Sequence, residues 1–399
     1  MPDEWPTPRV TYRRCQDYSI VASPSPVKEN GGGRTNVEIN LSDYWDYLNG
    51  IAHEAIEAKK RKIRPPLRRL SVFITDLCNL NCDYCKIDRS EARTMDMRWL
   101  LSSLPVARSM GAIFLDVMGL GEPTLVPGLP EILQQASSLG FVVTIGTNAA
   151  TANLSRPDYL ARLLSASPIK LRVSLDSAKP EVHDRSRRRH DTWHKAIRFI
   201  EKVIRERERG RLQAGLFINK VVNTNNLTET ARDVDFFAEL GVDDVHLIPI
   251  RWVESEYCSP DQIRYFNAEI APQVEEIAFR KRLAWAKKNA YIFGRTREEI
   301  SMASRGIYYQ PQTAKECYSL QAQLLVDACV HPYTCLWSKR NGGRSLQRET
   351  GDTTDLEHLW EKLGRIPYLD VNPHICQNLC TREIIHANNE VENALSTTR

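Results

Sequence analysis

Three cysteines, Cys78, Cys82 and Cys85, lie within eight residues, directly after the apolar run 70–75. Three thiolates on so short a loop can hold three corners of an iron-sulfur cubane and leave one iron open. An open iron can bind a small molecule and pass it an electron, whereas a fully ligated cluster only transfers electrons. Structural zinc is the alternative, but it needs a fourth ligand, and His53 lies well upstream in a helical pattern. The spacing therefore favours an iron-sulfur cluster.

The composition is that of an ordinary globular protein. The 399 residues are 42% hydrophobic and 26% charged, enough for one large domain and a smaller one. No apolar run approaches the roughly 18 residues that a membrane span requires, and the first residues do not resemble a signal peptide. The net charge of +4 is too small to indicate nucleic-acid binding. We therefore expect a cytoplasmic protein without membrane or nucleic-acid partners.

The residues that could do chemistry must be positioned by the elements around them. From residue 70 onward, short β-branched runs alternate with longer amphipathic segments, which is the pattern of βα units around a parallel sheet. The six expected strands are 70–75, 112–118, 141–146, 169–175, 214–222 and 245–250. The helices expected between them are 97–110, 129–139, 157–164, 192–209 and 226–240. Six units are too few to close an eight-stranded barrel.

The segments on either side of these units have different compositions. Residues 1 to about 40 contain proline-serine and glycine clusters typical of loops or linkers, and a helix over 43–62 is expected to follow. Residues 251–313 are expected to be helical, with an apolar stripe at Phe266, Ile270, Val274 and Ile277. We divide the chain into an N-terminal extension, a barrel, a helical bridge and a cysteine-rich C-terminal domain, at 1–69, 70–250, 251–313 and 314–399.

Polar and glycine-containing segments follow several of the expected strands. In a parallel barrel, the chemistry gathers where the strands end. A glycine turn lets a backbone approach a ligand closely, a carboxylate can bind an ammonium group, and an arginine can bind a carboxylate bidentately. The segments that offer these groups are 119–123, 147–148, 174–177 and 183–187.

The cysteine motif, with an apolar strand before it and an aromatic residue, Tyr84, before the third cysteine, resembles the radical S-adenosylmethionine (radical SAM) superfamily. The resemblance implies an α/β fold, a partial (β/α)6 barrel of the TIM type. It implies a 4Fe-4S cluster on Cys78, Cys82 and Cys85 that binds S-adenosylmethionine. Reductive cleavage would give a 5'-deoxyadenosyl radical that takes hydrogen from an unactivated C-H bond. A donor such as flavodoxin or ferredoxin would supply the electron.

The resemblance also implies which residues contact the cofactor. Gly119, Gly121 and Glu122 resemble the family's G-G-E-P motif, whose carboxylate takes the α-ammonium of the methionine moiety. Asn148 resembles the ribose-contacting residue. Taken alone, Thr-Asn is equally typical of an Asx-turn.

The fourth strand and the segment after it resemble the family's methionine-carboxylate site. Ser174 and Arg187 are the expected ligands of that carboxylate, with Asp176 in the same motif. The choice of Arg187 rests on register alone, so the neighbouring arginines at 185, 188 and 189 stay open. The remaining expected cofactor contacts are Tyr84 and Ile248, the latter beside adenine.

A second cysteine group lies near the C-terminus, where a hairpin with 324–326 as one of its strands and a helix at 356–363 are expected. The arrangement resembles the SPASM/Twitch extension of radical SAM enzymes, and the number of cysteines favours the shorter Twitch type with one auxiliary 4Fe-4S cluster. The resemblance implies four ligands, Cys317, Cys335, Cys376 and Cys380. Cys329 falls at the hairpin turn. It could instead be a labile ligand or a thiol that faces the active site.

These features lead us to expect a radical enzyme that acts on a peptide or natural-product precursor by oxidation, crosslinking or epimerisation. Dehydrogenation of a sugar-like or cyclitol alcohol is the second interpretation. A non-catalytic iron-sulfur carrier or scaffold is the alternative from another class. Cys258, after the last expected strand, is a candidate hydrogen-atom donor, although lone cysteines are usually small hydrophobes.

Overall fold

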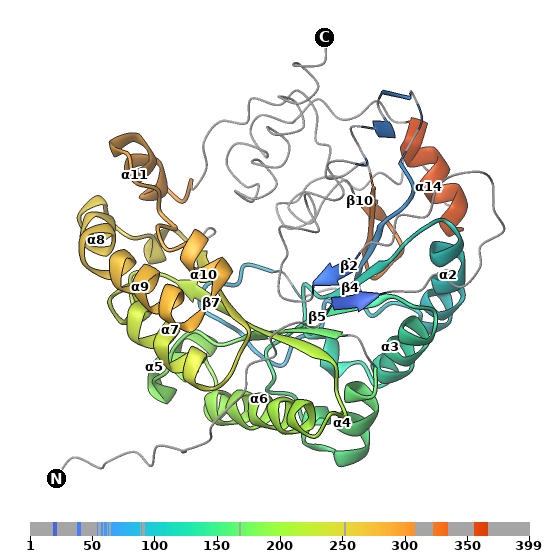
Figure 1. Ribbon diagram of the computed structural model, residues 1–399, viewed down its shortest axis with the longest axis horizontal. Helices are drawn as coiled ribbons and strands as arrows, with labels where there is room; N and C mark the ends of the chain where they lie inside the picture. The colour runs from blue at the N-terminus through green and yellow to red at the C-terminus, as the bar shows by residue number, and fades with distance from the viewer. Residues whose placement is uncertain are drawn as a thin grey trace.

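The computed structural model describes residues 19–21, 38–40, 54, 57–58, 60–61, 63, 65–87, 89, 92–166, 169–250, 253–307, 322–333 and 355–365. Its centre is a curved sheet of eight strands, with an arc of helices on the convex side (Figure 1). The expected auxiliary-cluster ligands lie outside the described residues. They are Cys317, Cys335, Cys376 and Cys380.

Six strands run parallel and pair in chain order. They are β3 (Arg69–Phe73), β4 (Phe114–Met118), β5 (Val142–Thr147), β6 (Ile169–Ser174), β7 (Ala214–Val222) and β8 (Asp244–Pro249). Strands covered on one face by helices and on the other by the barrel interior form apolar runs, and Leu70, Val117 and Leu171 are fully buried. The open six-stranded arrangement predicted from the sequence is confirmed.

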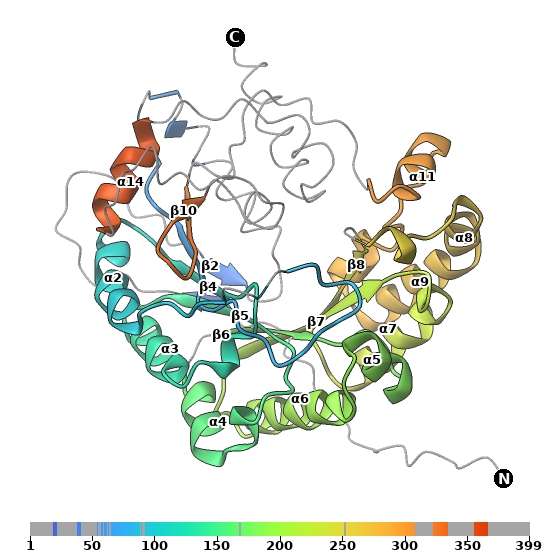
Figure 2. The same ribbon diagram turned by 180° about the vertical axis from the view of Figure 1, so that it is seen from behind.

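Five helices connect these strands on the convex side (Figures 1 and 2). They are α2 (Met97–Ser109), α3 (Leu129–Ser138), α4 (Pro157–Leu164), α6 (Thr192–Glu208) and α7 (Thr230–Glu239), and the sequence predicted all of them. It did not predict α5 (Pro180–Arg187), because the buried residues of α5 are His183 and Arg187 rather than an apolar stripe. This missed helix carries several residues of the candidate site.

The hairpin expected near residue 324 is present and is joined to the barrel sheet. β9 (Gln323–Val326) pairs in parallel with β3, and β10 (Pro332–Tyr333) pairs antiparallel with β9. An unpaired β3 would expose a row of backbone donors and acceptors, and β9 satisfies them. The expected helix over 356–363 is α14 (Leu356–Arg365), which packs against α2 in both views.

The helical segment after the barrel is also present. Its elements are α8 (Pro260–Tyr265), the π-helix η5 (Phe266–Ile270), α9 (Ala271–Lys281), α10 (Ala284–Lys288) and α11 (Arg297–Ala303). Phe266, Ile270 and Val274 of the predicted stripe are buried. Among the described helices, none is long and apolar enough to cross a membrane.

Residues 1–40 contain two short strands that the sequence did not predict. β1 (Ser19–Val21) and β2 (Glu38–Asn40) form a two-stranded antiparallel sheet. The proline and glycine clusters at 23–26 and 31–33 fall between the two strands, so they mark the connection rather than the absence of strands.

Candidate active site

The cysteine loop begins where β3 ends, at the edge of the sheet where the carboxyl ends of the parallel strands meet. Cys78, Cys82 and Cys85 are free thiols and are partly buried. The Cys85 amide donates to the Cys82 carbonyl at 3.1 Å, which closes a tight turn. Burial raises the pKa of Cys78 and of Cys82, and the charge of a neighbouring thiolate adds to each shift. The three thiols therefore lie on one short, partly buried loop at this edge of the sheet.

Each thiol faces a nitrogen donor from a different segment. Asn148 Nδ2 lies 3.9 Å from Cys78 Sγ, Arg187 Nη1 lies 3.7 Å from Cys82 Sγ, and Arg89 Nη2 lies 3.3 Å from Cys85 Sγ. These donors come from the end of β5, from α5 and from the cysteine loop itself. Hydrogen bonds to the sulfurs of an iron-sulfur cluster help to set its reduction potential. The arrangement fits a cluster that keeps negative charge on its sulfurs.

Buried polar atoms without partners point to a missing group at the same place. Among the described residues, Arg187 Nε, Arg89 Nε and Asn219 Oδ1 are buried and make no hydrogen bond. Buried polar atoms are normally paired, so these three require an explanation. Asn219 lies opposite Ser174 in the register of β6 and β7. The two orphaned guanidinium nitrogens, on residues that face Cys82 and Cys85, fit a bound polar molecule such as S-adenosylmethionine beside the thiols.

The glycine turn after β4 packs against the cysteine loop. A Cβ at Gly121 would lie 1.9 Å from the Leu77 carbonyl oxygen, and a Cβ at Gly119 would lie 2.6 Å from the Gly121 carbonyl oxygen. The Gly121 amide donates to Thr75 O at 3.0 Å, and the Glu122 amide donates to Leu77 O at 2.7 Å. We expected this turn to approach a ligand. At Gly121 the close neighbour is instead the backbone that leads into Cys78.

Glu122 connects the ends of β4 and β5. Its side chain is 2% exposed and accepts four hydrogen bonds, from the Thr124 amide (3.1 Å) and hydroxyl (2.6 Å), the Thr147 hydroxyl (2.7 Å) and the Asn148 amide (2.6 Å). Burial raises its pKa although these donors oppose the shift. Asn148 Nδ2 in turn donates to Asn79 Oδ1 at 2.9 Å. Glu122 thus helps to position the donor that faces Cys78.

Asp176 and Arg187 form a fully buried ion pair beside the loop. The shortest N···O distance is 2.9 Å, and Asp176 also accepts from the Tyr84 and Ser186 hydroxyls, both at 2.8 Å. Burial alone would raise the pKa of Asp176, but Arg187 and these donors hold it below its usual value. Burial raises the pKa of Tyr84, which keeps its hydroxyl protonated as a donor. The guanidinium also lies 5.4 Å from the Tyr84 ring centroid.

A second buried layer supports this pair, and sequence reasoning missed it. Lys220 Nζ lies 2.7 Å from Asp233 Oδ2 and 2.5 Å from the Asp176 carbonyl oxygen. Asp233 Oδ1 accepts from the Ala178 amide at 2.7 Å. His183 Nδ1 accepts from the Asp176 amide at 3.1 Å, and burial lowers the pKa of His183 to about 3. Lys220, a lysine within the apolar run 214–222, was the feature of the sequence that could have indicated this buried layer.

Of the other expected residues, Ser174 and Ile248 lie on the sheet and Cys258 lies in the core. Ser174 and Ile248 are partly exposed and share one face of the sheet, because Ser174 pairs with Asn219, and Ile248 pairs with Val221 two residues further along β7. Cys258 is 1% exposed and lies in the main hydrophobic core, where burial raises its pKa to about 12. That burial argues for a packing role and against a hydrogen-atom donor.

Residues 72–210 match the family model described as the Radical SAM superfamily. A probable GTP 3',8-cyclase of Saccharolobus solfataricus is 29% identical over 227 residues, which are 54% of this chain and 67% of the relative. An AdoMet-dependent heme synthase of Methanosarcina barkeri is 29% identical over 203 residues, 48% of this chain and 54% of the relative. The chain thus spans about half of the second relative.

Two solved structures share the fold. SuiB of Streptococcus suis, bound to precursor peptide SuiA, superposes with a TM-score of 0.56 at 16% identity over 90% of this chain and 79% of SuiB. Native anSMEcpe with bound AdoMet and Kp18Cys peptide superposes with a TM-score of 0.55 at 15% identity over 83% of this chain and 99% of anSMEcpe. The match identifies residues 72–210 as a radical SAM domain, and the relatives found by sequence are themselves named as enzymes.

Proposed function

We propose that this enzyme removes hydrogen from an unactivated C-H bond of a peptide or natural-product precursor, with oxidation, crosslinking or epimerisation as the outcome. The observation that carries the proposal is the set of three thiols, each facing its own nitrogen donor at the carboxyl edge of the sheet. When bound, the 4Fe-4S cluster and S-adenosylmethionine supply a one-electron cleavage that generates the hydrogen-abstracting radical.

The chain's own residues hold and orient these groups. Cys78, Cys82 and Cys85 ligate three irons. The buried Asp176 carboxylate keeps Arg187 beside Cys82, and the free Nε of Arg187 is then available to a carboxylate, which a guanidinium binds in a planar, directional way. We therefore assign Arg187 to both the Cys82 sulfur and the carboxylate of the methionine moiety.

The remaining cofactor residues act directly or through a neighbour. Ser174 and Ile248, on one face of the sheet, are assigned to direct contact with S-adenosylmethionine, Ile248 beside its adenine. Asn148 is assigned to contact with the ribose of S-adenosylmethionine, as the family resemblance implies. The residues assigned to shaping the cradle are Tyr84, Gly119, Gly121, Glu122 and Asp176. Because Glu122 already accepts four hydrogen bonds, it acts on the cofactor mainly through the segments that it holds.

A small apolar cluster at the ends of β3 and β4 suits a radical reaction. Phe73, Leu325 and Tyr333 form a small buried cluster apart from the main core, with Met118 and Leu120 packed against it. A radical near these side chains would meet few polar groups. Exclusion of water from the reacting centre suppresses side reactions.

A peptide substrate is supported by two relatives of the same fold, SuiB and anSMEcpe, which were solved with peptides bound. A smaller substrate is the second candidate, because the relatives found by sequence are named as a GTP cyclase and a heme synthase. The sugar-like or cyclitol alcohol belongs to this second class. A flavodoxin- or ferredoxin-type electron donor stays part of the proposal.

One auxiliary 4Fe-4S cluster on Cys317, Cys335, Cys376 and Cys380 also stays part of the proposal. Its support is the order of the elements, with the hairpin β9–β10 followed by α14, as in the Twitch pattern. Such a cluster near the substrate would accept the second electron of a net oxidation. With four cysteine ligands it would have no open iron.

Transfer of deuterium from the substrate tests the proposed function. The reduced enzyme is incubated with S-adenosylmethionine and either a deuterated precursor peptide encoded beside its gene or deuterated cyclitols and sugars. We expect deuterium in 5'-deoxyadenosine with the peptide and none with Cys78→Ala. Label only from the small alcohols would establish the second candidate and overturn the first.

A further inference from the structure

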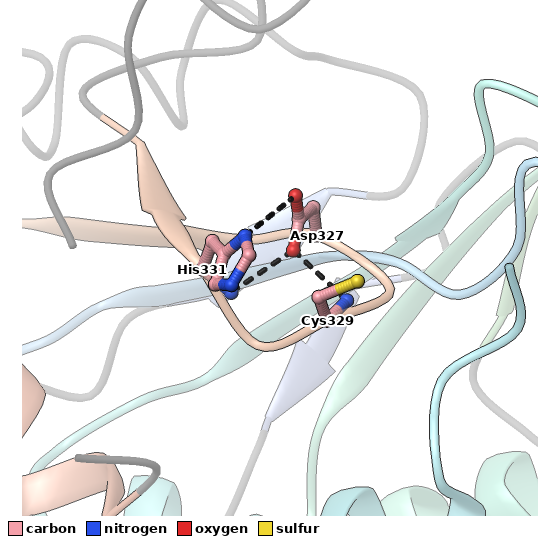
Figure 3. A group of neighbouring side chains, drawn as sticks. All are labelled: Asp327, Cys329 and His331. Atoms are coloured by element: carbon pink, nitrogen blue, oxygen red, sulfur yellow. Dashed lines mark hydrogen bonds and ion pairs between the residues drawn. The ribbon is translucent and has the colours of Figure 1, made fainter. Parts of the chain in front are cut away.

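The turn between β9 and β10 gathers three metal-ligating side chains, Asp327, Cys329 and His331 (Figure 3). One ligand atom from each lies within 4.8 Å of those of the other two. Ligand atoms around one tetrahedral ion, at bond lengths of about 2.0–2.3 Å, lie roughly 3.5 Å apart. Small rotations of the side chains would therefore bring the set onto a single ion.

The turn is organised around the Asp327 carboxylate. Its Oδ1 accepts the amides of Cys329 and His331, both at 2.9 Å, and its Oδ2 accepts the Tyr333 hydroxyl at 3.1 Å. Figure 3 shows the first two contacts converging on one oxygen. Between the two potential ligands, Val330 has φ 65°, a left-handed conformation that β-branched residues rarely adopt. The turn thus fixes the backbone that carries Cys329 and His331.

The separation of the imidazole from the carboxylate also fits a shared ion. His331 Nδ1 lies 3.7 Å from Asp327 Oδ2. That is too long for a good N-H···O hydrogen bond and close to the distance between two ligands of one metal. Cys329 and His331 are both partly exposed, so an ion could enter from solvent.

We propose that Asp327, Cys329 and His331 bind one divalent transition-metal ion, for which zinc is the probe. A thiolate and an imidazole favour a borderline ion of this kind over magnesium or calcium, which prefer oxygen ligands alone. Binding releases the thiol proton of Cys329 to solvent. Three protein ligands leave a fourth position for water or for a donor atom of the substrate.

The place of this site suggests what it serves. Because β9 runs parallel to β3, the turn after β9 lies at the same edge of the sheet as the cysteine loop after β3. It also adjoins the small apolar cluster through Leu325 and Tyr333. A substrate donor atom held on the ion would lie at the edge where the radical is generated.

The contact between Arg93 and Cys329 predicts the direction in which zinc affinity changes when Arg93 is replaced. Arg93 Nη1 donates to Cys329 Sγ at 3.2 Å, and the arginine is exposed. Its positive charge opposes a cation on the same sulfur, so the guanidinium must move aside when the ion binds. We expect Arg93→Gln to bind zinc severalfold more tightly.

The experiment uses the holoenzyme with its iron-sulfur clusters loaded. After equilibration with zinc chloride and desalting, zinc, iron and acid-labile sulfide are measured per chain. We expect Cys329→Ala and His331→Ala each to hold one equivalent of zinc less than the parent, with iron and sulfide unchanged. His358→Ala, which removes an exposed histidine from α14, is the matched control and keeps the parent zinc content.

Three results would overturn the inference. Equal zinc in the parent, Cys329→Ala and His331→Ala would show that the turn binds no ion. Loss of iron in Cys329→Ala would make Cys329 a cluster ligand instead. Weaker zinc binding by Arg93→Gln would contradict the expected competition. None of these results depends on S-adenosylmethionine cleavage, so the inference can fail while the proposed function stands.

Discussion

Two thiol-bearing turns lie at the same edge of the sheet, and the fold holds them in different ways. The cysteine loop after β3 is fixed by distant segments, with Asn148, Arg187 and the Gly121 turn all contacting it. The turn after β9 is fixed mainly by its own residue, Asp327. A site that depends on the whole barrel should fail when distant residues change. A site built within one turn should not.

The largest expected effect comes from the glycine that lets the β4 turn pass the cysteine loop. In Gly121→Ala the new Cβ would overlap the Leu77 carbonyl oxygen, so the backbone before Cys78 must move. We expect loss of most of the iron of the radical SAM cluster. Gly146→Ala, where a Cβ would meet nothing within 4 Å, is the control. Equal iron in both variants would show that the loop tolerates the shift.

The next effect concerns stability. Asp176→Ala leaves Arg187 buried without its carboxylate, and breaking a buried pair in this way costs about 3–5 kcal/mol. Glu131→Ala breaks the exposed pair with Arg162, which should cost less than about 1 kcal/mol. Urea unfolding of both variants measures the difference. Similar losses of unfolding free energy in the two variants would mean that the Asp176–Arg187 pair is not the main support of the cysteine loop.

A pH dependence is expected from His183. Its folded pKa of about 3 lies below the ordinary value of 6.5, so the unfolded chain binds more protons between these values. Stability should therefore rise with pH across that window and level off above it, by at most roughly 5 kcal/mol in total. His183→Gln should have a flatter profile in urea unfolding at about pH 4.5 and about pH 7. An unchanged slope would assign the dependence to other groups.

The smallest effect is on the reduction potential of the cluster. Arg89 donates to Cys85 Sγ, and loss of this cationic donor should lower the midpoint potential without removing iron. Redox titration followed by electron paramagnetic resonance compares Arg89→Gln with Lys86→Gln, which removes an exposed charge from the same loop. Equal shifts in the two variants would indicate general charge rather than the contact with sulfur.

Much of the barrel could be predicted from the sequence because buried parallel strands form continuous apolar runs. The pairing of β9 with β3 could not, since Leu70 and Leu324 come together from positions far apart in the chain. Arg187, chosen by register among several arginines, does face Cys82. The partners of Glu122 and Asp176 were missed for the same reason as the pairing of β9. Thr147 and Asn148, which bond Glu122, and Tyr84 and Ser186, which bond Asp176, lie on other elements, so no local pattern indicates these contacts.

The central claim is that the loop of Cys78, Cys82 and Cys85 supports reductive cleavage of S-adenosylmethionine. The most direct measurement is the amount of 5'-deoxyadenosine formed by the anaerobic, iron-loaded enzyme after chemical reduction. We predict product from the parent, from Cys258→Ala and from Cys329→Ala, and none from Cys82→Ala. Parent-level product from Cys82→Ala, or no product from the parent with its cluster intact and reduced, would contradict this claim.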